Sequence, residues 1–373
     1  MISLLFAVAL AQATQDDAVL QKADRIFEEA KALYESARDK SSVPGFVEAE
    51  FKLEEARIKY LVLQEIGQGD KPQIAADRLR ALIQLGKLIR DSKVAITGAF
   101  VDKVPPAKKP ESPPDPTAPP PPPPAPPVDV SKRAPVPDPA KQKEAEKAVR
   151  DLFKDQYALK GIAERRGFVR KLLEQASQNA SDPVAQWVLY REARDVAVQC
   201  ADVRAALESV ELTARVFDVE PLAMKVQTLA ASDKAARVPA DFLELARAQD
   251  ALVDDLVRVD QYDAAVRTAS AAQANARKSN DPAFAAKMAV RSKDVGEAKT
   301  LFDGLKRTLE ALARNSDDPA GNAEMGKYLC YAKGNWELGL RFMVKGSDAA
   351  LKALAEKEMA ALGKSTADQL AAA

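Results

Sequence analysis

The chain has 373 residues, of which 47% are hydrophobic and 29% are charged, and 55 Lys and Arg residues balance 55 Asp and Glu residues. This length allows two or three domains, and the zero net charge provides no electrostatic footprint for nucleic acid or for an anionic membrane. The chain has no His and only two Cys, so it lacks the commonest general base and cannot form a multi-thiolate metal site by itself. We therefore expect no catalytic residues, no metal ligands and no cofactor.

The first thirteen residues have the pattern of a secretory signal peptide. The apolar run Ile2–Leu10 is too short to span a bilayer, which needs about 20 residues, and it is followed by Ala11-Gln-Ala13 and a polar stretch. This pattern predicts cleavage after Ala13 and an exported protein, periplasmic or secreted. The alternative is that these residues begin a helix, since no Lys or Arg precedes the apolar run. No later stretch is apolar enough to predict a stable membrane insertion.

Residues 14–103 are predicted to form a bundle of three helices. Apolar residues recur every three or four positions in the stretches 17–39, 46–66 and 73–95, which is typical of amphipathic helices. Short, turn-rich sequences separate the stretches and favour antiparallel neighbours. A bundle of this size is only marginally stable alone, so we expect it to dock a partner or to self-associate.

Residues 104–139 contain 17 of the 24 prolines, including the run Pro119–Pro124. Such a sequence favours the extended polyproline II conformation, makes no internal hydrogen bonds and cannot form a core. We expect a disordered linker between two structured regions. Its function is either that of a spacer or that of a ligand for aromatic-lined grooves.

Residues 140–373 are rich in Ala, poor in Pro and helical in pattern throughout. An Asp stands directly before a Pro at Asp182, Asp281 and Asp318. This dipeptide predicts a helix start, because Asp accepts an otherwise unpaired backbone N–H and Pro lacks one.

A second recurrence in this region predicts helical hairpins. A polar turn residue is followed by a larger residue and then by small apolar residues at 200–207, 259–266 and 333–340. This pattern is similar to the turn of a tetratricopeptide-type hairpin, although the spacing is uneven. We expect an all-α domain of tetratricopeptide-like stacked hairpins, with an irregular helical bundle as the alternative.

The last hairpin carries the sequence NAEMGKYLCYAKGNWELGL at 322–340 and KGSDAALK at 345–352. It resembles a module of uncharacterised exported proteins of planctomycete bacteria, and Arg191–Asp195 and Phe217–Glu220 look like the same module. The resemblance covers about residues 168–358. It implies an exported, all-α, repeat-like module without established catalytic residues, so it adds no site residues.

Motifs for nucleotide binding and for acid catalysis are incomplete. Gly363-Lys-Ser-Thr366 resembles the end of a phosphate-binding loop, but Glu358 occupies the position where the required Gly would stand. Adjacent carboxylates occur at 54–55, 254–255 and 317–318. Side chains of adjacent residues on a helix point about 100° apart. We therefore expect these carboxylates to lie on solvated helix faces or to cap helices.

Cys200 and Cys330 are the only thiols. A bridge between them is chemically allowed in an exported chain. We favour two unpaired, buried helix residues, because the thiols lie in hairpins that are not expected to be neighbours.

Trp336, Tyr328 and Tyr331 form the densest aromatic cluster of the sequence. We predict that all three pack in the core of the last hairpin, and that Trp187 and Tyr190 are core residues in the same way. The alternative is an exposed platform that stacks on a sugar or a peptide.

These observations predict a non-enzymatic exported protein that acts as a scaffold or in protein–protein interactions, with a protein or peptide partner in the cell envelope. Stacked hairpins present a concave groove that suits an extended peptide or another helix. The alternative is a cell-wall or glycan-binding module that uses exposed aromatic residues. A buried Trp336 would favour the scaffold, and an exposed Trp336 would favour the glycan-binding module.

Overall fold

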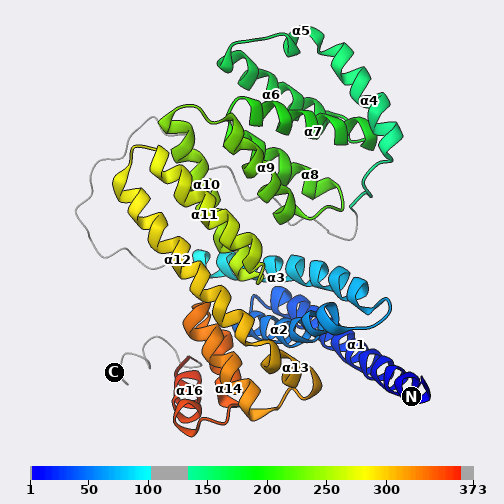
Figure 1. Ribbon diagram of the computed structural model, residues 1–373, viewed down its shortest axis with the longest axis vertical. Helices are drawn as coiled ribbons and strands as arrows, with labels where there is room; N and C mark the ends of the chain where they lie inside the picture. Colours follow the sequence, from blue (N-terminus) through cyan, green and yellow to red (C-terminus); the bar gives the residue numbers. More distant parts are fainter. Residues whose placement is uncertain (1, 102–132, 363–373) are drawn as a thin grey trace. The chain divides into compact units, whose positions relative to one another are not determined.

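The computed structural model describes the backbone of residues 2–101 and 133–362, and the side chains of residues 13–96 and 133–360. In these ranges the regular structure consists of sixteen α-helices and one π-helix, with no β-structure beyond one isolated bridge (Figure 1). The protein is therefore all-α, as the sequence predicts. Within the same ranges, we find no helix that combines the length and the hydrophobicity needed to cross a bilayer.

The chain folds into two compact units, and the first of them is discontinuous. It consists of residues 1–127 and 301–373, and the second unit consists of residues 128–300. This division differs from the predicted one, because residues 301–373 group with the N-terminal helices rather than with a domain that begins at residue 140. The boundary falls inside helix α12 (Pro282–Gly304).

The predicted proline-rich linker, 104–139, lies mostly outside the described residues, and only its last part is seen. Ala134 forms a parallel bridge with Phe217. The N–H of Ala134 donates to the carbonyl of Val216 at 2.8 Å, and its carbonyl accepts the N–H of Asp218 at 2.9 Å. The end of the predicted linker is thus part of the second unit.

Three long helices share the main core of the first unit: α1 (Ile2–Asp39), α2 (Val43–Ile66) and α3 (Lys71–Val101). The amphipathic faces predicted from the sequence meet there. The core contains Ala23, Phe27, Ala30, Tyr34, Phe46, Ala49, Leu53, Ala56, Tyr60, Leu63, Leu79, Leu82 and Ile89. Residues 2–13, the predicted signal peptide, belong to α1 in this structure, and their cleavage stays a prediction.

The C-terminal part of the first unit packs on α2. It contains α13 (Lys306–Arg314), α14 (Pro319–Lys327), the π-helix η2 (Tyr328–Ala332), α15 (Trp336–Val344) and α16 (Ala349–Leu362). Both α13 and α15 contact α2. Phe51 of α2 lies 5.2 Å from Phe342 of α15, measured between ring centroids. The two ends of the chain are thereby joined in one unit.

The contact between α2 and α13 is polar at its centre. Lys59 is 1% exposed, and its ammonium donates to the carbonyls of Leu312 at 3.3 Å and Ala313 at 2.9 Å. These carbonyls lie at the C-terminal end of α13, where the helix dipole is negative. Burial, together with repulsion from Lys22, lowers the pKa of Lys59 to about 8.

The close approach of α14 and α15 depends on two glycines. A Cβ atom at Gly326 would lie 2.6 Å from Cγ of Met343, and a Cβ atom at Gly339 would lie 2.3 Å from Sγ of Cys330. Both distances are shorter than any van der Waals contact allows. Only a residue without a side chain therefore permits this packing.

The second unit is a succession of helices joined by short turns, coloured green to yellow in Figure 1. Its helices are α4 (Pro139–Leu152), α5 (Lys154–Tyr157), α6 (Ile162–Gln178), α7 (Pro183–Gln199), α8 (Val203–Val216), α9 (Pro221–Ala235), α10 (Pro239–Arg258), α11 (Tyr262–Lys278) and most of α12. Consecutive helices such as α6 and α7, or α10 and α11, pack against each other. The tetratricopeptide-like arrangement stays a prediction.

The helix starts predicted from Asp–Pro dipeptides are confirmed. The carboxylate of Asp182 accepts the backbone N–H of Val184 at the start of α7, and Asp281 and Asp318 cap α12 and α14 in the same way. Pro follows as the first residue of each helix. Each start is therefore encoded locally.

The predicted hairpin turns share one backbone conformation. Ala201, Asp260 and Gly334 have φ values of 52°, 60° and 65°, and each stands directly before the N-cap of the next helix. In the first two turns, the N-cap N–H donates to the carbonyl five residues earlier, as in a Schellman motif. In the last turn it donates six residues back, to Leu329, because η2 adds one residue to the final helical turn.

Candidate functional site

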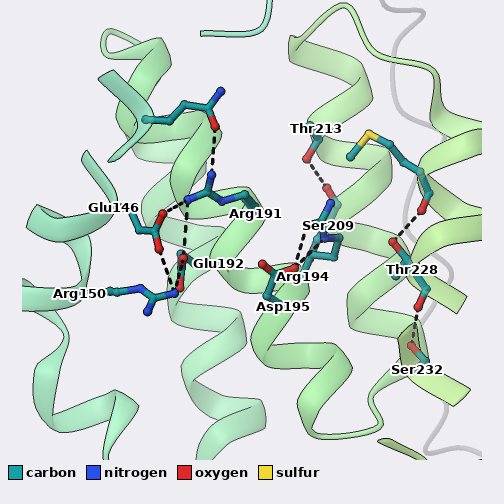
Figure 2. Close-up of polar contacts among 12 residues, drawn as sticks. Glu146, Arg150, Arg191, Glu192, Arg194, Asp195, Ser209, Thr213, Thr228 and Ser232 are labelled. Atoms are coloured by element: carbon teal, nitrogen blue, oxygen red, sulfur yellow. Dashed lines mark hydrogen bonds and ion pairs between the residues drawn. The ribbon is translucent and has the colours of Figure 1, made fainter. Parts of the chain in front are cut away.

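In the segment Arg191–Asp195, which carries part of the resemblance, Arg191 and Glu192 form an ion-pair network with α4 (Figure 2). Arg191 donates to the amide oxygen of Gln142 at 3.0 Å and pairs with Glu146 at 2.6 Å. Arg150 pairs with Glu146 at 3.1 Å and with Glu192 at 3.3 Å. This network joins α4 to α7.

Glu192 is the buried member of this network. Its carboxylate accepts the O–H of Tyr157 at 2.7 Å. Burial and this hydrogen bond raise the pKa of Tyr157, and attraction to Glu192 raises the pKa of Arg150. We assign the network a structural role, because each of its carboxylates is already paired with a cation or accepts a hydrogen bond from the hydroxyl of Tyr157.

Hydroxyl groups on α8 and α9 are also used inside the fold (Figure 2). Each donates to the carbonyl oxygen four residues earlier on its own helix, which satisfies a polar group in a helix interface. The donors are Ser209, Thr213, Thr228 and Ser232. Because these hydroxyl groups are used within their own helices, we do not assign any of them as a nucleophile.

A cleft of about 580 Å³ opens in the second unit, and it is the candidate binding site. It is lined by the first turns of α6, the turn between α7 and α8, the end of α9 and the start of α10. The lining residues are Ile162, Arg165, Arg166, Val198, Gln199, Cys200, Ala201, Ala231, Lys234, Ala235, Arg237, Val238 and Asp241. We refer to it as the basic cleft.

The charge of the basic cleft is strongly one-sided. Four of its side chains are cationic and one is a carboxylate, whereas the whole chain has no net charge. The carboxylate of Asp241 is already used, because it accepts the backbone N–H groups of Arg237 at 2.9 Å and Val238 at 3.1 Å. These hydrogen bonds hold the carboxylate in place, and the lining carries three more cations than carboxylates.

The cations of the basic cleft are fixed to different degrees. Arg165 donates to the side chain of Gln199, and Arg166 lies 3.5 Å from the carboxylate of Asp202. Arg237 donates to two carbonyls at the end of α9, at 2.6 and 2.9 Å. Lys234 makes no ion pair with any described residue and is exposed to solvent. It is the cation that is most available to a ligand.

Apolar groups flank the basic cleft. Ile162 and Val238 are 61% and 51% exposed, although both are large and hydrophobic. Cys200 lies at the floor, where burial raises the pKa of its thiol despite the nearby Arg165 and Arg166. A thiol with a raised pKa stays protonated and is a poor nucleophile. The cleft therefore has the chemistry of a binding site for an anionic ligand with an apolar part.

This cleft was not predicted from the sequence, although a signal was present. Arg165 and Arg166 follow the start of α6 within about one turn, and Arg237 stands just before α10. Helix N-termini favour acidic residues over basic ones. Basic residues at two helix starts break this local preference, and such breaks are typical of functional sites.

No family model, curated protein or solved structure matches this chain. The resemblance of the last hairpin to exported planctomycete proteins therefore stays a prediction.

A second cleft, of about 540 Å³, lies in the first unit between the ends of α2 and α12 and the start of α13. Its charges are mixed. Lys306 pairs there with Glu65, and Asp303 and Glu310 also line it. It has no one-sided charge comparable to that of the basic cleft.

The predicted core position of two aromatic residues is wrong. Tyr331 and Trp336 are 63% and 51% exposed, whereas Tyr328 is buried as predicted. Gly334 adopts the left-handed conformation expected of it. The turn nevertheless directs later residues of α15, such as Leu340, into the core instead of Trp336, the first residue of that helix.

The other predicted aromatic core residues pack differently from each other. Tyr190 is buried, and Trp187 is partly buried against the core of α4 to α8. The ring of Trp187 meets that of Phe217 edge to face at 5.0 Å. Both residues therefore contribute to packing rather than to an exposed surface.

The adjacent carboxylates 54–55 are not solvated, in contrast to the prediction. Glu54 and Glu55 are buried on α2. Glu54 pairs with Arg57 at 2.6 Å, and Glu55 pairs with Lys52 at 3.1 Å and with Lys345 at 3.4 Å. They are buried because the C-terminal helices of the first unit cover this side of α2.

The remaining predicted features are accounted for. At 254–255 the carboxylates pair with arginines, and at 317–318 one pairs with Lys345 and the other caps α14. Cys200 and Cys330 are both buried and free. Gly363–Thr366 lies outside the described residues. Among the described side chains, no group of three or more Cys, Asp or Glu is arranged to hold a metal ion.

Proposed function

We propose that this protein is a non-enzymatic interaction protein whose second unit binds an acidic segment of a partner protein. The observation that carries the proposal is the one-sided charge of the basic cleft, with four cations against one engaged carboxylate. Charge complementarity of this kind gives specificity and speeds association. The exposed Ile162 and Val238 add apolar contacts beside the charged ones.

The geometry favours an extended acidic peptide. The cleft crosses four helix ends, so a ligand in it would contact Arg165 and Lys234 on different helices. Carboxylates of a peptide would meet these cations, and an adjacent Leu or Val would cover Ile162. Contacts of this kind are screened by salt, so binding should weaken as the salt concentration rises.

A direct binding measurement tests this function. A short fluorescein-labelled peptide that combines several Glu with one Leu is titrated with the full chain, and fluorescence anisotropy is recorded. Lys234→Glu should weaken the affinity about tenfold, which corresponds to about 1.4 kcal/mol. Lys143→Glu makes the same charge change on an exposed part of α4, outside the cleft, and should leave the affinity unchanged. Equal effects of the two variants would contradict the proposal.

We also propose that the protein is exported, and the support for this is the signal-like sequence of residues 1–13. The partner would then be a protein or peptide of the cell envelope. N-terminal sequencing of the extracytoplasmic fraction should give a chain that begins at Thr14. An intact Met1 in that fraction would contradict cleavage.

The exposure of Trp336 favours a second candidate function, binding through exposed aromatic residues. For a glycan ligand, the rings of Tyr331 and Trp336 would stack on a sugar face. Titration with soluble cell-wall oligosaccharides, followed by tryptophan fluorescence, measures this activity. An unchanged spectrum would remove this candidate.

A further inference from the structure

Tyr331 and Trp336 form an exposed aromatic corner. Their ring centroids are 5.5 Å apart, and the ring planes are inclined at 89°. Both rings are more than half exposed, although burial of each would be favourable by a few kcal/mol. Two exposed aromatic rings in edge-to-face contact present an angled apolar surface to a ligand.

The backbone fixes this corner in place. Tyr331 lies in η2, and single-turn π-helices are frequent at functional sites. The left-handed Gly334 then turns the chain, and Asn335 caps α15 through a hydrogen bond from the N–H of Leu338 at 3.2 Å. Trp336 follows as the first residue of α15, so both rings stand on rigid backbone.

The polar groups around the corner are already engaged. The side-chain oxygen of Asn335 is used by its helix, and the carboxylate of Glu337 accepts from Lys93 at 2.6 Å. Lys333 lies over the ring of Tyr328. A sugar needs several hydrogen-bond partners around its stacked face. This corner therefore suits a ligand that offers apolar rings and few hydrogen-bond donors.

We propose that the aromatic corner binds the proline-rich segment of this same chain, at the run Pro119–Pro124. Proline has no N–H, so its backbone leaves no donor to satisfy, and polyproline II segments are recognised by aromatic-lined grooves. The proline carbonyls remain as acceptors for the phenol O–H of Tyr331 and the indole N–H of Trp336. Six consecutive prolines provide several equivalent registers for this contact.

The length of the chain allows the contact within one molecule. Lys93 of α3 binds Glu337, the neighbour of Trp336, and α3 ends at Val101, about 12 Å further along the helix. The residues between Val101 and Pro119 span up to about 55 Å when extended at about 3.1 Å each. The run is therefore tethered well within reach of the corner. Such tethering gives a high effective concentration, so a weak intrinsic affinity is sufficient.

Quenching of Trp336 fluorescence tests the contact in the full chain. Trp187→Phe leaves Trp336 as the sole tryptophan. Acrylamide quenching should increase when Pro119–Pro124 is replaced by Gly and Ser at constant length. Replacement of Pro105, Pro106 and Pro110 in the same way is the control and should leave the quenching unchanged. Equal quenching in all three chains would overturn the proposal.

A second measurement does not depend on Trp187. A labelled synthetic peptide of residues 117–127 should bind to the chain that lacks the proline run, and Tyr331→Ala or Trp336→Ala should abolish this binding. Both rings are exposed, so these variants should keep their fold. Lack of peptide binding would contradict the proposal.

Two other occupants give distinct results. If a second copy of the chain supplies the run, protection of Trp336 is lost on dilution, and the intramolecular contact is refuted. If the ligand is a glycan, soluble cell-wall oligosaccharides protect Trp336 while the peptide does not, and the aromatic corner is a sugar-binding site instead.

Discussion

The close approach of α14 and α15 allows a sharp test of the first unit, through the substitution Gly326→Ala. The added Cβ would lie 2.6 Å from Cγ of Met343, and 3.0 Å from both the carbonyl oxygen of Gly339 and the N of Met343. The side chain of Met343 can move, but the two backbone atoms cannot move independently of α15. The substitution should therefore push the two helices apart.

The size of the effect is the balance of two opposing contributions. Overpacking by one methyl group costs about 1–3 kcal/mol. Ala is a better helix former than Gly by about 1 kcal/mol, which offsets part of this cost. Because three atoms lie within 3.0 Å of the added Cβ, we take the upper part of the overpacking range, about 2–3 kcal/mol. We therefore expect the last hairpin to open more easily by about 1–2 kcal/mol, which is about a 5- to 30-fold larger population of the open form.

The thiol of Cys330 reports this opening directly. It lies in η2 and is buried against α15, and burial raises its pKa to about 11. We therefore expect it to react with a thiol reagent such as DTNB only when the hairpin opens. Cys200→Ala leaves it as the sole thiol. In this background, Gly326→Ala should accelerate the reaction about 5- to 30-fold, in proportion to the open population.

Gly296→Ala is the matched control, because a Cβ at this helical glycine of α12 meets no atom within 4 Å. It should leave the rate at Cys330 unchanged. If Gly326→Ala reacts as slowly as the control, the helices do not approach as closely as described, and the reasoning is wrong.

Three further outcomes are expected. The pKa of Lys59 is about 8 in the folded chain and 10.5 in the unfolded chain, so the unfolded chain binds more protons between these pH values. The free energy of unfolding should therefore rise with pH from about 8 to 10. Urea titrations of Lys59→Met should lack this rise. A fragment of residues 133–300 should show cooperative, helical thermal unfolding by circular dichroism, and a non-cooperative melt would contradict the division into two units. Both thiols should be unreactive in the native chain, and a thiol reagent should titrate two thiols after denaturation. A titre of one thiol, or of none, would show that Cys200 and Cys330 are not both free.

The all-α class and the three helix starts at Asp–Pro dipeptides were predictable because their causes are local. Asp182 and Asp318 accept backbone N–H groups of the helix that follows directly, and the apolar periodicity of residues 17–39 depends only on neighbours in sequence. Such features do not depend on what the helix later packs against.

The failures concern features that depend on distant residues. Trp336 has large apolar neighbours in sequence, but its exposure is decided by which face of α15 meets α14 and α2. In the sequence Glu54 and Glu55 resemble a solvated pair, but α13 and α15, about 250 and 290 residues later in the chain, cover α2. The basic cleft likewise gathers side chains from α6, α9 and α10, and no local pattern brings them together. Periodicity reports which residues share a helix face, and not which face is covered.

The discontinuity of the first unit determines the order in which the protein can fold. During synthesis from the N-terminus, α2 emerges long before α13, because the acceptor of Lys59, Ala313, follows 254 residues later. All residues of the second unit emerge between these two partners, so that unit can finish folding first. The closing of so long a loop is slow, and a chain cut short before α13 would leave the charged face of α2 exposed. The contacts on this face of α2 can therefore form only after the whole second unit has been synthesised.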